Sequence, residues 1–304
     1  MGLIVIVISL VLERTFGHMQ HLRRMDWLVS YRQKIFSWVP DHWSFGYKGM
    51  AVLLLPVIVA TLLLQSLFAG HWWGVLELLF SVAVVTYCLG PEAFNHQVDL
   101  YLDACGRGDR LAAKVVAEKL VGKPVADDEH RQAKQVTTAI LYEGNVRIFA
   151  VLFWFLVLGP LGALLYRVVA ALMHESRKFV ESPHADASEI ELCRATEKTF
   201  AVLDWLPAHI LSLSFFLAGS FDDAWQGWRR VYAAEQELAE RTRSIVVSTG
   251  CGAMQHEVDD AMSEESDEGD YDLQWIRMAR ALVWRSLVIW LVFVALITMA
   301  NIGI

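Results

Sequence analysis

Charged residues are scarce in this sequence. Asp, Glu, Lys and Arg make up 20% of the 304 residues, against about 25% in an ordinary soluble chain. No basic stripe with interleaved aromatic residues is present, so we expect no nucleic-acid partner. Only four cysteines occur, and because none forms a Cys-x-x-Cys pair we expect neither a zinc site nor a disulfide framework. Regular alternation of polar and apolar residues is also lacking, which disfavours an outer-membrane barrel.

Long apolar runs dominate instead, and 55% of the residues are hydrophobic. The clearest run is Met50–Ala69, whose only polar residues are Thr61, Gln65 and Ser66. At about 1.5 Å per residue, a helix of this length crosses a hydrocarbon core of about 30 Å. The sequence therefore predicts an all-α, polytopic helical membrane protein with a single membrane domain over residues 1–304. We expect the lipid bilayer to be one of its partners.

The apolar and polar runs divide the chain into predicted segments. These are a short first helix over residues 2–12, a transmembrane hairpin over 50–90, a cytoplasmic segment of amphipathic helices over 91–147, a membrane helix over 200–221, and a C-terminal transmembrane helix over 281–300. Lys and Arg are frequent in the 91–147 segment, which places it in the cytoplasm by the positive-inside bias. Glu77 lies within the hairpin, and we expect it to face other helices because a charged side chain in lipid is costly.

The apolar segment over residues 148–172 is interrupted at its middle by Gly159-Pro160 and by Gly162. Proline removes a backbone hydrogen bond and breaks or kinks a helix. The segment is therefore either one kinked span or a re-entrant pair of half-helices. We favour the re-entrant form, because it keeps Arg167 and the Arg and Lys residues that follow on the cytoplasmic side.

An acidic stretch precedes the last span. Residues 256–272 hold nine Asp and Glu residues and no Lys or Arg, so this stretch accounts for the net charge of −8. Like charges at this density repel one another and bury little apolar surface. We therefore predict that residues 250–272 form an acidic disordered loop.

Four polar residues follow the predicted hairpin at steps of four, three and four: Glu92, His96, Asp99 and Asp103. In a helix this spacing places them on one face. A row of carboxylates beside a histidine can hold a divalent cation or a polar ligand. The alternative, which we favour, is the solvated face of a cytoplasmic helix.

Two further polar groups border the apolar segments. Glu143, Asn145 and Arg147 precede the broken segment, and Asp204 and His209 flank Pro207 at the start of the next one. Each group can line a pocket, since polar groups near membrane depth need partners. Each can instead be structural, as residues at a kink or as a helix cap.

The order and wording of several segments resemble the AmpE family, which implies a bacterial inner-membrane protein linked to β-lactamase regulation. The resemblance covers nearly the whole chain. It is carried by Leu89–Glu92 (LGPE), Gly106–Asp109, Arg147–Arg167 (RIFAVLFWFLVLGPLGALLYR), Leu203–Ile210 (LDWLPAHI), Gly219–Arg229 (GSFDDAWQGWR) and the C-terminal span.

AmpE is in turn similar to the CobD/CbiB membrane synthases, which join an aminopropanol phosphate to a corrinoid carboxylate with ATP. The resemblance implies ligand-binding roles for residues that match or approximate that pattern: His96, Asp109, Glu143, Asn145, Arg147, Arg167, Asp204 and His209. The chain departs from the pattern at Gly144, which separates Glu143 from Asn145, and at His209, where the synthases have Arg. It also lacks a GxxxxGK[ST] phosphate loop.

These departures favour a non-catalytic signalling or accessory protein that binds a ligand or protein partner on the cytoplasmic side. The alternative is a membrane-bound, ATP-dependent amide-forming synthase with an altered site and magnesium nucleotide as its cofactor. The sequence names no catalytic residue and no metal ligand for either function.

Overall fold

Helices form all of the regular structure in the part of the chain that the structure describes. The computed structural model describes residues 2–15, 27–40, 46–68, 74–180, 187–261 and 268–302. The predicted all-α fold is confirmed. The chain divides into two compact units, one of Met1–Leu89 with Ala150–Leu206 and one of Gly90–Phe149 with Pro207–Ile304.

The first unit holds the apolar helices that precede residue 90 and the interrupted segment. Its elements are α1 (Gly2–Thr15), α2 (Trp27–Phe36), α3 (Gly46–Phe68), α4 (Val75–Cys88), α8 (Ala150–Leu158), α9 (Pro160–Val180) and the first part of α10 (Ala187–Ala218). The predicted hairpin corresponds to α3 and α4, which pack against each other. Helix α4 has 14 residues, or about 21 Å, which is shorter than a full span.

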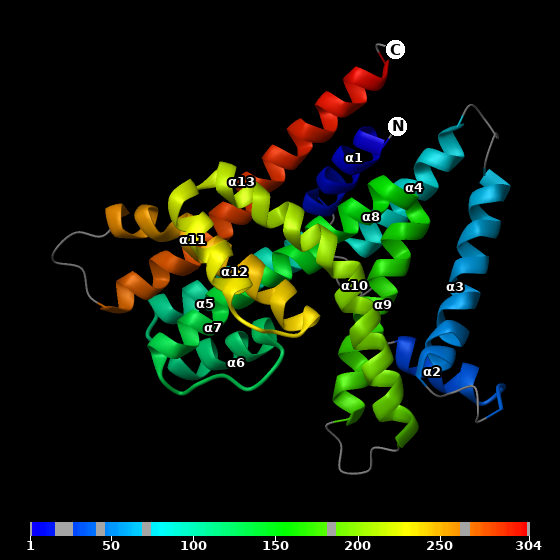
Figure 1. Cartoon of the computed structure of the whole chain (residues 1–304), viewed down its shortest axis with the longest axis horizontal. Coiled ribbons are helices and arrows are strands. Elements are labelled where there is room, and N and C mark those ends of the chain that lie inside the picture. The colour runs from blue at the N-terminus through cyan, green and yellow to red at the C-terminus, as the bar shows by residue number, and fades with distance from the viewer. Residues whose placement is uncertain are drawn as a thin grey trace. The chain divides into compact units, whose positions relative to one another are not determined.

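The second unit holds the polar helices and the C-terminal helix. Its elements are α5 (Pro91–Gly106), α6 (Arg110–Val121), α7 (Glu129–Gly144), a π-helical turn (Asn145–Phe149), the end of α10, α11 (Phe221–Ala233), α12 (Leu238–Ala261) and α13 (Glu268–Ile302). Helix α7 packs on α13, α5 on α6, and α11 on α12 (Figure 1).

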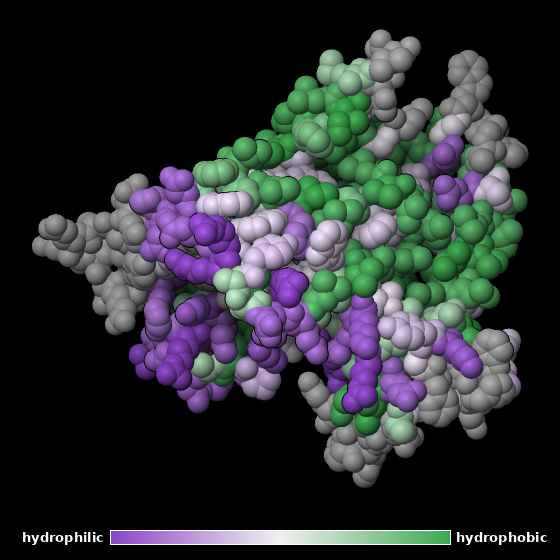
Figure 2. Space-filling model, in the orientation of Figure 1, coloured by the Kyte–Doolittle hydropathy of each residue, from purple (hydrophilic) through white to green (hydrophobic). Residues whose placement is uncertain are grey.

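Within the described residues, four helical stretches are long and apolar enough to cross a membrane: Gly46–Phe68, Glu129–Leu158, Ala187–Ala218 and Asp272–Ala300. Exposed apolar side chains cover α3, including Leu55, Leu63 and Leu67, and the end of α13, including Phe293 and Leu296. Figure 2 shows these two helices as hydrophobic surface, whereas the surface over α6 is hydrophilic. This distribution is that of a helical membrane protein.

The chain reverses direction at Gly159, between α8 and α9. Gly159 has a φ of +68°, a conformation that glycine adopts readily. Helices α8 and α9 then pack together. A Cβ atom on Gly162 would lie 2.2 Å from the carbonyl oxygen of Trp154, so the hairpin closes only because residue 162 has no side chain. Residues 148–172 thus form two helices joined at Gly159, and the re-entrant placement of this hairpin in the membrane stays a prediction.

Two expectations are corrected. Gly250–Ala261 is helical rather than disordered, because its buried side chains, Ala253, Met254 and Val258, form an apolar face between the acids. Residues 268–272 begin α13, and residues 262–267 lie outside the described part. Glu77 is exposed rather than turned toward other helices. It lies in the first turn of α4, where the helix dipole favours an acid.

Candidate functional site

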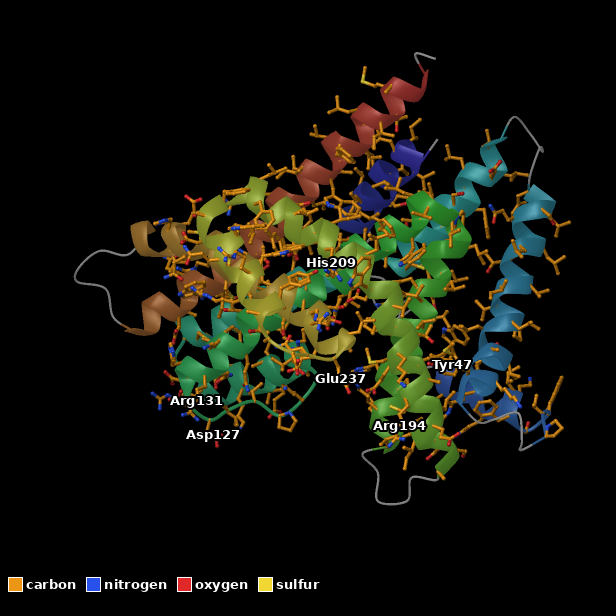
Figure 3. The ribbon with its side chains drawn as sticks, viewed as in Figure 1. Tyr47, Asp127, Arg131, Arg194, His209 and Glu237 are labelled. Atoms are coloured by element: carbon orange, nitrogen blue, oxygen red, sulfur yellow. The ribbon has the colours of Figure 1, made fainter. Side chains whose placement is uncertain are left out.

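A pocket of about 760 Å³ opens in the second unit between α5, α6, α7 and the start of α13. Its lining combines apolar side chains with paired charges and buried polar groups. The lining residues used below are Tyr101 and Cys105 of α5, Arg110 and Lys114 of α6, Asp127, Glu129 and Gln132 at α7, and Asp272 of α13. Asp127 is labelled in Figure 3.

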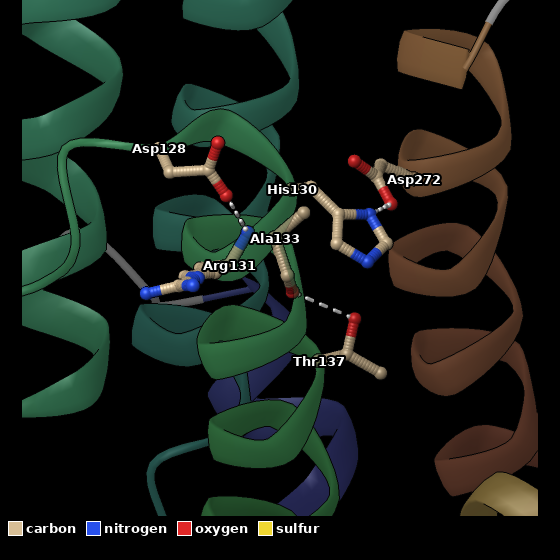
Figure 4. Close-up of polar contacts among 6 residues, drawn as sticks. All are labelled: Asp128, His130, Arg131, Ala133, Thr137 and Asp272. Carbon is tan, nitrogen blue, oxygen red and sulfur yellow. Dashed lines mark hydrogen bonds and ion pairs between the residues drawn. The ribbon is translucent and has the colours of Figure 1, made fainter.

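Helix caps position the walls of this pocket. The Asp109 carboxylate accepts a hydrogen bond from the Ala112 amide at 3.0 Å and so begins α6. The Asp128 carboxylate accepts one from the Arg131 amide at 3.0 Å and begins α7 (Figure 4). Such caps satisfy backbone donors that the first turn leaves free. Asp109, predicted as a ligand-binding residue, is therefore seen here as a helix cap.

Ion pairs join the walls at the pocket rim. Arg110 pairs with Glu129, and Lys114 with Asp127. Hydrogen bonding between the latter two raises the pKa of Lys114 and lowers that of Asp127. His130 Nδ1 lies 2.8 Å from Asp272 Oδ1, which links α7 to α13 (Figure 4). Exposed pairs of this kind add little stability, but they neutralise the charges around the opening.

The deeper wall carries polar groups that are shielded from water. Tyr101 is 3% exposed, and burial raises the pKa of its hydroxyl. Burial also raises the pKa of the neighbouring Cys105 thiol. Gln132 is 5% exposed, and its Nε2 has no hydrogen-bond partner among the described residues. A buried donor without a partner costs about 1–3 kcal/mol, so an acceptor atom in the pocket would be stabilised there.

The predicted acidic face of α5 is largely a solvated surface. His96, Asp99 and Asp103 are exposed, and Asp99 pairs with Arg280 of α13. The side chain of Glu92 lies outside the described part. No cluster of three His, Cys, Asp or Glu residues suited to a metal ion occurs among the residues described.

The polar group at the end of α7 is held by its own helix. Arg147 Nε donates to Glu143 Oε2 at 2.6 Å, and both side chains are half-buried. Asn145 is fully buried in the π-helical turn. Gly144 would bring a Cβ atom 3.1 Å from Val283, so α7 approaches α13 closely at this point. The glycine that interrupts the Glu-Asn pair thus lies at a close contact between the two helices.

Two of the segments that carry the family resemblance, Arg147–Arg167 and Leu203–Ile210, are joined by hydrogen bonds. Pro207 has no N–H group, so the Leu203 carbonyl loses its usual partner in α10. Trp154 Nε1 of α8 donates to that carbonyl at 3.0 Å. At the next residue of α10, the Asp204 carboxylate accepts a hydrogen bond from the Tyr166 hydroxyl at 2.7 Å. These bonds give the motif residues a structural role.

The other two residues that the resemblance singles out, His209 and Arg167, take no part in these two hydrogen bonds. His209 belongs to the second unit, where its Nε2 lies 2.8 Å from the Tyr232 hydroxyl and its ring meets the edge of Trp228. His209 is labelled in Figure 3. Arg167 is half-buried on α9 of the first unit. Residues five apart in a helix differ by roughly 140° in direction, so Asp204 and His209 face different sides of α10.

The chain is an all-α integral membrane protein. This class is defined by its apolar helices, by the hairpin at Gly159 and by the exposed apolar surface over α3 and α13. The sequence matches the family described as regulatory signalling modulator protein AmpE over residues 1–301. The chain belongs to this AmpE family. The family assignment agrees with the resemblance found in the sequence.

Curated relatives come from two groups. Protein AmpE of Shigella flexneri is 26% identical over 235 residues, which cover 75% of this chain and 78% of that protein. The cobalamin biosynthesis protein CobD of Chromobacterium violaceum is 27% identical over 222 residues, covering 69% of this chain and 66% of the relative, just under two thirds. CobD of Stutzerimonas stutzeri is 25% identical and covers 82% and 80%. No solved structure matches the chain.

Proposed function

We propose that this chain is a multi-pass regulatory protein of the bacterial inner membrane that modulates β-lactamase induction or related cell-wall signalling. Family membership supports a regulatory role, and the AmpE relative from Shigella flexneri supports the same assignment. In this proposal the apolar helices anchor the chain, and the polar helices α5–α7 bind a ligand or partner on the cytoplasmic side.

The observation that carries the proposal is the pairing of charges at the pocket. Both cationic side chains among the described lining residues, Arg110 and Lys114, are held by carboxylates of the same pocket. A site for phosphoryl transfer directs cations toward the substrate phosphates. This pocket instead offers a buried amide donor at Gln132 and the apolar side chains of Ala113 and Ala133. It is suited to a small polar ligand of low net charge.

The second candidate is an ATP-dependent amide-forming synthase, which the two CobD relatives favour. Such an enzyme requires carboxylates for magnesium and cations for phosphate. In the second unit the Glu143 carboxylate is bound to Arg147, Asp99 to Arg280, and Asp109 to the start of α6. These residues do not fit a magnesium nucleotide, and we assign no catalytic step to them.

The test is β-lactamase induction in a strain that lacks its own copy of the gene. The strain is complemented with the wild-type chain or with one of three variants. Gln132→Leu removes the buried donor, and Ala133→Leu fills the pocket. Thr137→Val is the matched control: it lies one turn further along α7, is equally buried, and does not line the pocket.

Deletion should change the induction of β-lactamase. The wild-type chain and Thr137→Val should restore it, and the two pocket variants should not, at equal amounts in the membrane. An unchanged response after deletion would overturn the regulatory role. Full restoration by both pocket variants would show that the pocket is not its site.

A further inference from the structure

Helix α11 has three distinct faces. The side chains of Ala224, Gly227 and Val231 are buried. The adjacent face is aromatic along its whole length, with Phe221, Trp225, Trp228 and Tyr232 at steps of four, three and four. At about 100° per residue, these four side chains fall within roughly 60° of one another. The third face is polar and includes Gln226, Arg229 and Arg230, all exposed.

The buried face is held against α12 at backbone contact. A Cβ atom on Gly227 would lie 2.2 Å from the Ser248 carbonyl oxygen, and one on Gly252 would lie 2.3 Å from that of Asp223. Glycine at these points lets the two helix backbones touch, as small residues do in membrane helix pairs. Helix α11 therefore cannot roll to bury its aromatic face, and the direction of that face is fixed.

The aromatic face remains open to the surroundings. Phe221 is 58% exposed, Trp225 45% and Tyr232 49%. Phe216 of α10 is buried beneath the stripe, and its ring centroid lies 5.4 Å from that of Phe221 and 5.7 Å from that of Trp228. Apolar surface of this extent is costly in water, at about 25 cal/mol per Å², and marks a contact surface.

We propose that the aromatic stripe of α11 lies in the interfacial layer of the lipid bilayer, so that α11 is a membrane-surface helix. Helix α10 is long and apolar enough to cross the membrane, and it ends at Ala218, three residues before α11 begins. The last turns of α10 expose Leu213 at 51% and Leu217 at 74%. The stripe therefore starts where a membrane helix leaves the hydrocarbon core.

The residue types fit this layer. Tryptophan and tyrosine are enriched at the level of the lipid headgroups, where the ring is apolar and its N–H or O–H group meets water. Arg229 borders the stripe, and an arginine there extends its guanidinium to the lipid phosphates. The polar face of α11 is left to the aqueous side. An aromatic face beside a charged and polar face, here Arg229, Arg230, Gln226 and Asp222, is typical of interfacial helices.

The placement has a consequence for the second unit. Helix α12 is bound to α11 through the glycine contacts and also packs on α7, where Gly250 approaches Leu141. Helix α7 lines the pocket. A membrane-bound α11 would thus restrain α12 and, through the contact at Gly250, α7.

The experiment uses the full-length chain in phosphatidylcholine nanodiscs whose acyl chains are brominated near the headgroup. Bromine quenches tryptophan only at contact with the lipid, and iodide in the buffer quenches tryptophan exposed to water. Trp225→Phe removes one of 12 tryptophans while it preserves an aromatic side chain. The control, Trp225→Phe with Gln226→Trp, moves the indole by one residue onto the polar face, a rotation of about 100°.

The emission lost in Trp225→Phe, about one twelfth of the total if all tryptophans emit equally, should be the part that brominated lipid quenches. The emission regained at residue 226 should be quenched by iodide and not by bromine. Quenching of Trp225 by iodide alone would show a solvated stripe and overturn the proposal. Resistance of Trp225 to both quenchers would show that a protein or a second copy of the chain covers it, which also overturns the proposal. Equal size-exclusion profiles of the variants in nanodiscs confirm that they fold.

Discussion

The backbone contact between α11 and α12 makes a quantitative prediction about Gly227. In Gly227→Ala, the new methyl group would lie 2.2 Å from Ser248 O and 2.7 Å from its carbonyl carbon. Carbon and carbonyl oxygen atoms normally approach only to about 3.3 Å, so the helices must separate by roughly 1 Å. Because the obstructing atoms belong to the backbone, no side-chain rotation relieves the overlap.

Overpacking of this kind costs about 1–3 kcal/mol, whereas alanine gains about 0.8–1.0 kcal/mol over glycine in a helix interior. Because the overlap is with backbone atoms, the cost lies at the upper end of this range, and we expect Gly227→Ala to lower the free energy of unfolding by a net amount of about 1–2 kcal/mol. Gly252→Ala, which meets Asp223 O at 2.3 Å, should act in the same direction. The two effects should not add, because the residues share one interface.

Gly106 provides the matched control. It is the last residue of α5, and a Cβ atom there would meet no atom within 4 Å. Gly106→Ala should therefore leave stability unchanged or raise it by up to about 1 kcal/mol. Denaturant unfolding of the purified chain in one detergent, followed by circular dichroism, measures all three variants. Equal stability of Gly227→Ala and Gly106→Ala would refute close helix contact as the reason for glycine.

Two further predictions concern α10 and α12. Trp154→Phe removes the donor to the Leu203 carbonyl and should lower the free energy of unfolding by about 1–3 kcal/mol. Pro207→Ala restores the backbone donor, so in that background the cost of Trp154→Phe should be smaller. An unchanged cost in this double-mutant cycle would disprove that Trp154 replaces the hydrogen bond that Pro207 removes. Burial raises the pKa of the Cys251 thiol from 9.0 to about 11. The contribution of the protonated thiol to stability should therefore be complete below pH 9 and lost as the pH rises from 9 toward 11. Iodoacetamide should alkylate Cys251 slowly at pH 9 in the folded chain, and alkylation at the rate of the unfolded chain would contradict this.

Local rules predicted the parts of the fold that depend on few residues. The apolar run at residues 50–69 is long enough to give α3 without any knowledge of its neighbours, and Gly159-Pro160 with Gly162 breaks the next segment for backbone reasons alone. The acidic stretch was misjudged because charge density outweighed periodicity. Its apolar residues Ala253, Met254 and Val258 form one helical face, which becomes visible only when the positions are read at a period of 3.6.

The candidate site was harder to predict because conspicuous residues proved structural. Asp109 caps a helix, and Asp204 accepts a hydrogen bond from Tyr166. The pocket instead uses Tyr101 and Gln132, which carry no charge and no motif. In the sequence, these two residues could be noticed only as polar side chains on the apolar faces of amphipathic helices. Which helices enclose a pocket depends on tertiary contacts between α5, α7 and α13, which no local pattern specifies.

The most direct test of a regulatory rather than a synthetic role is growth of a bacterial strain that lacks its own CobD synthase and depends on newly made cobalamin. The chain is expressed in this strain, and its presence in the membrane is verified by immunoblot, beside a functional CobD as the positive control. We predict that the chain does not restore growth. Growth restored to the level of the CobD control would contradict the regulatory proposal and assign the chain to the synthases.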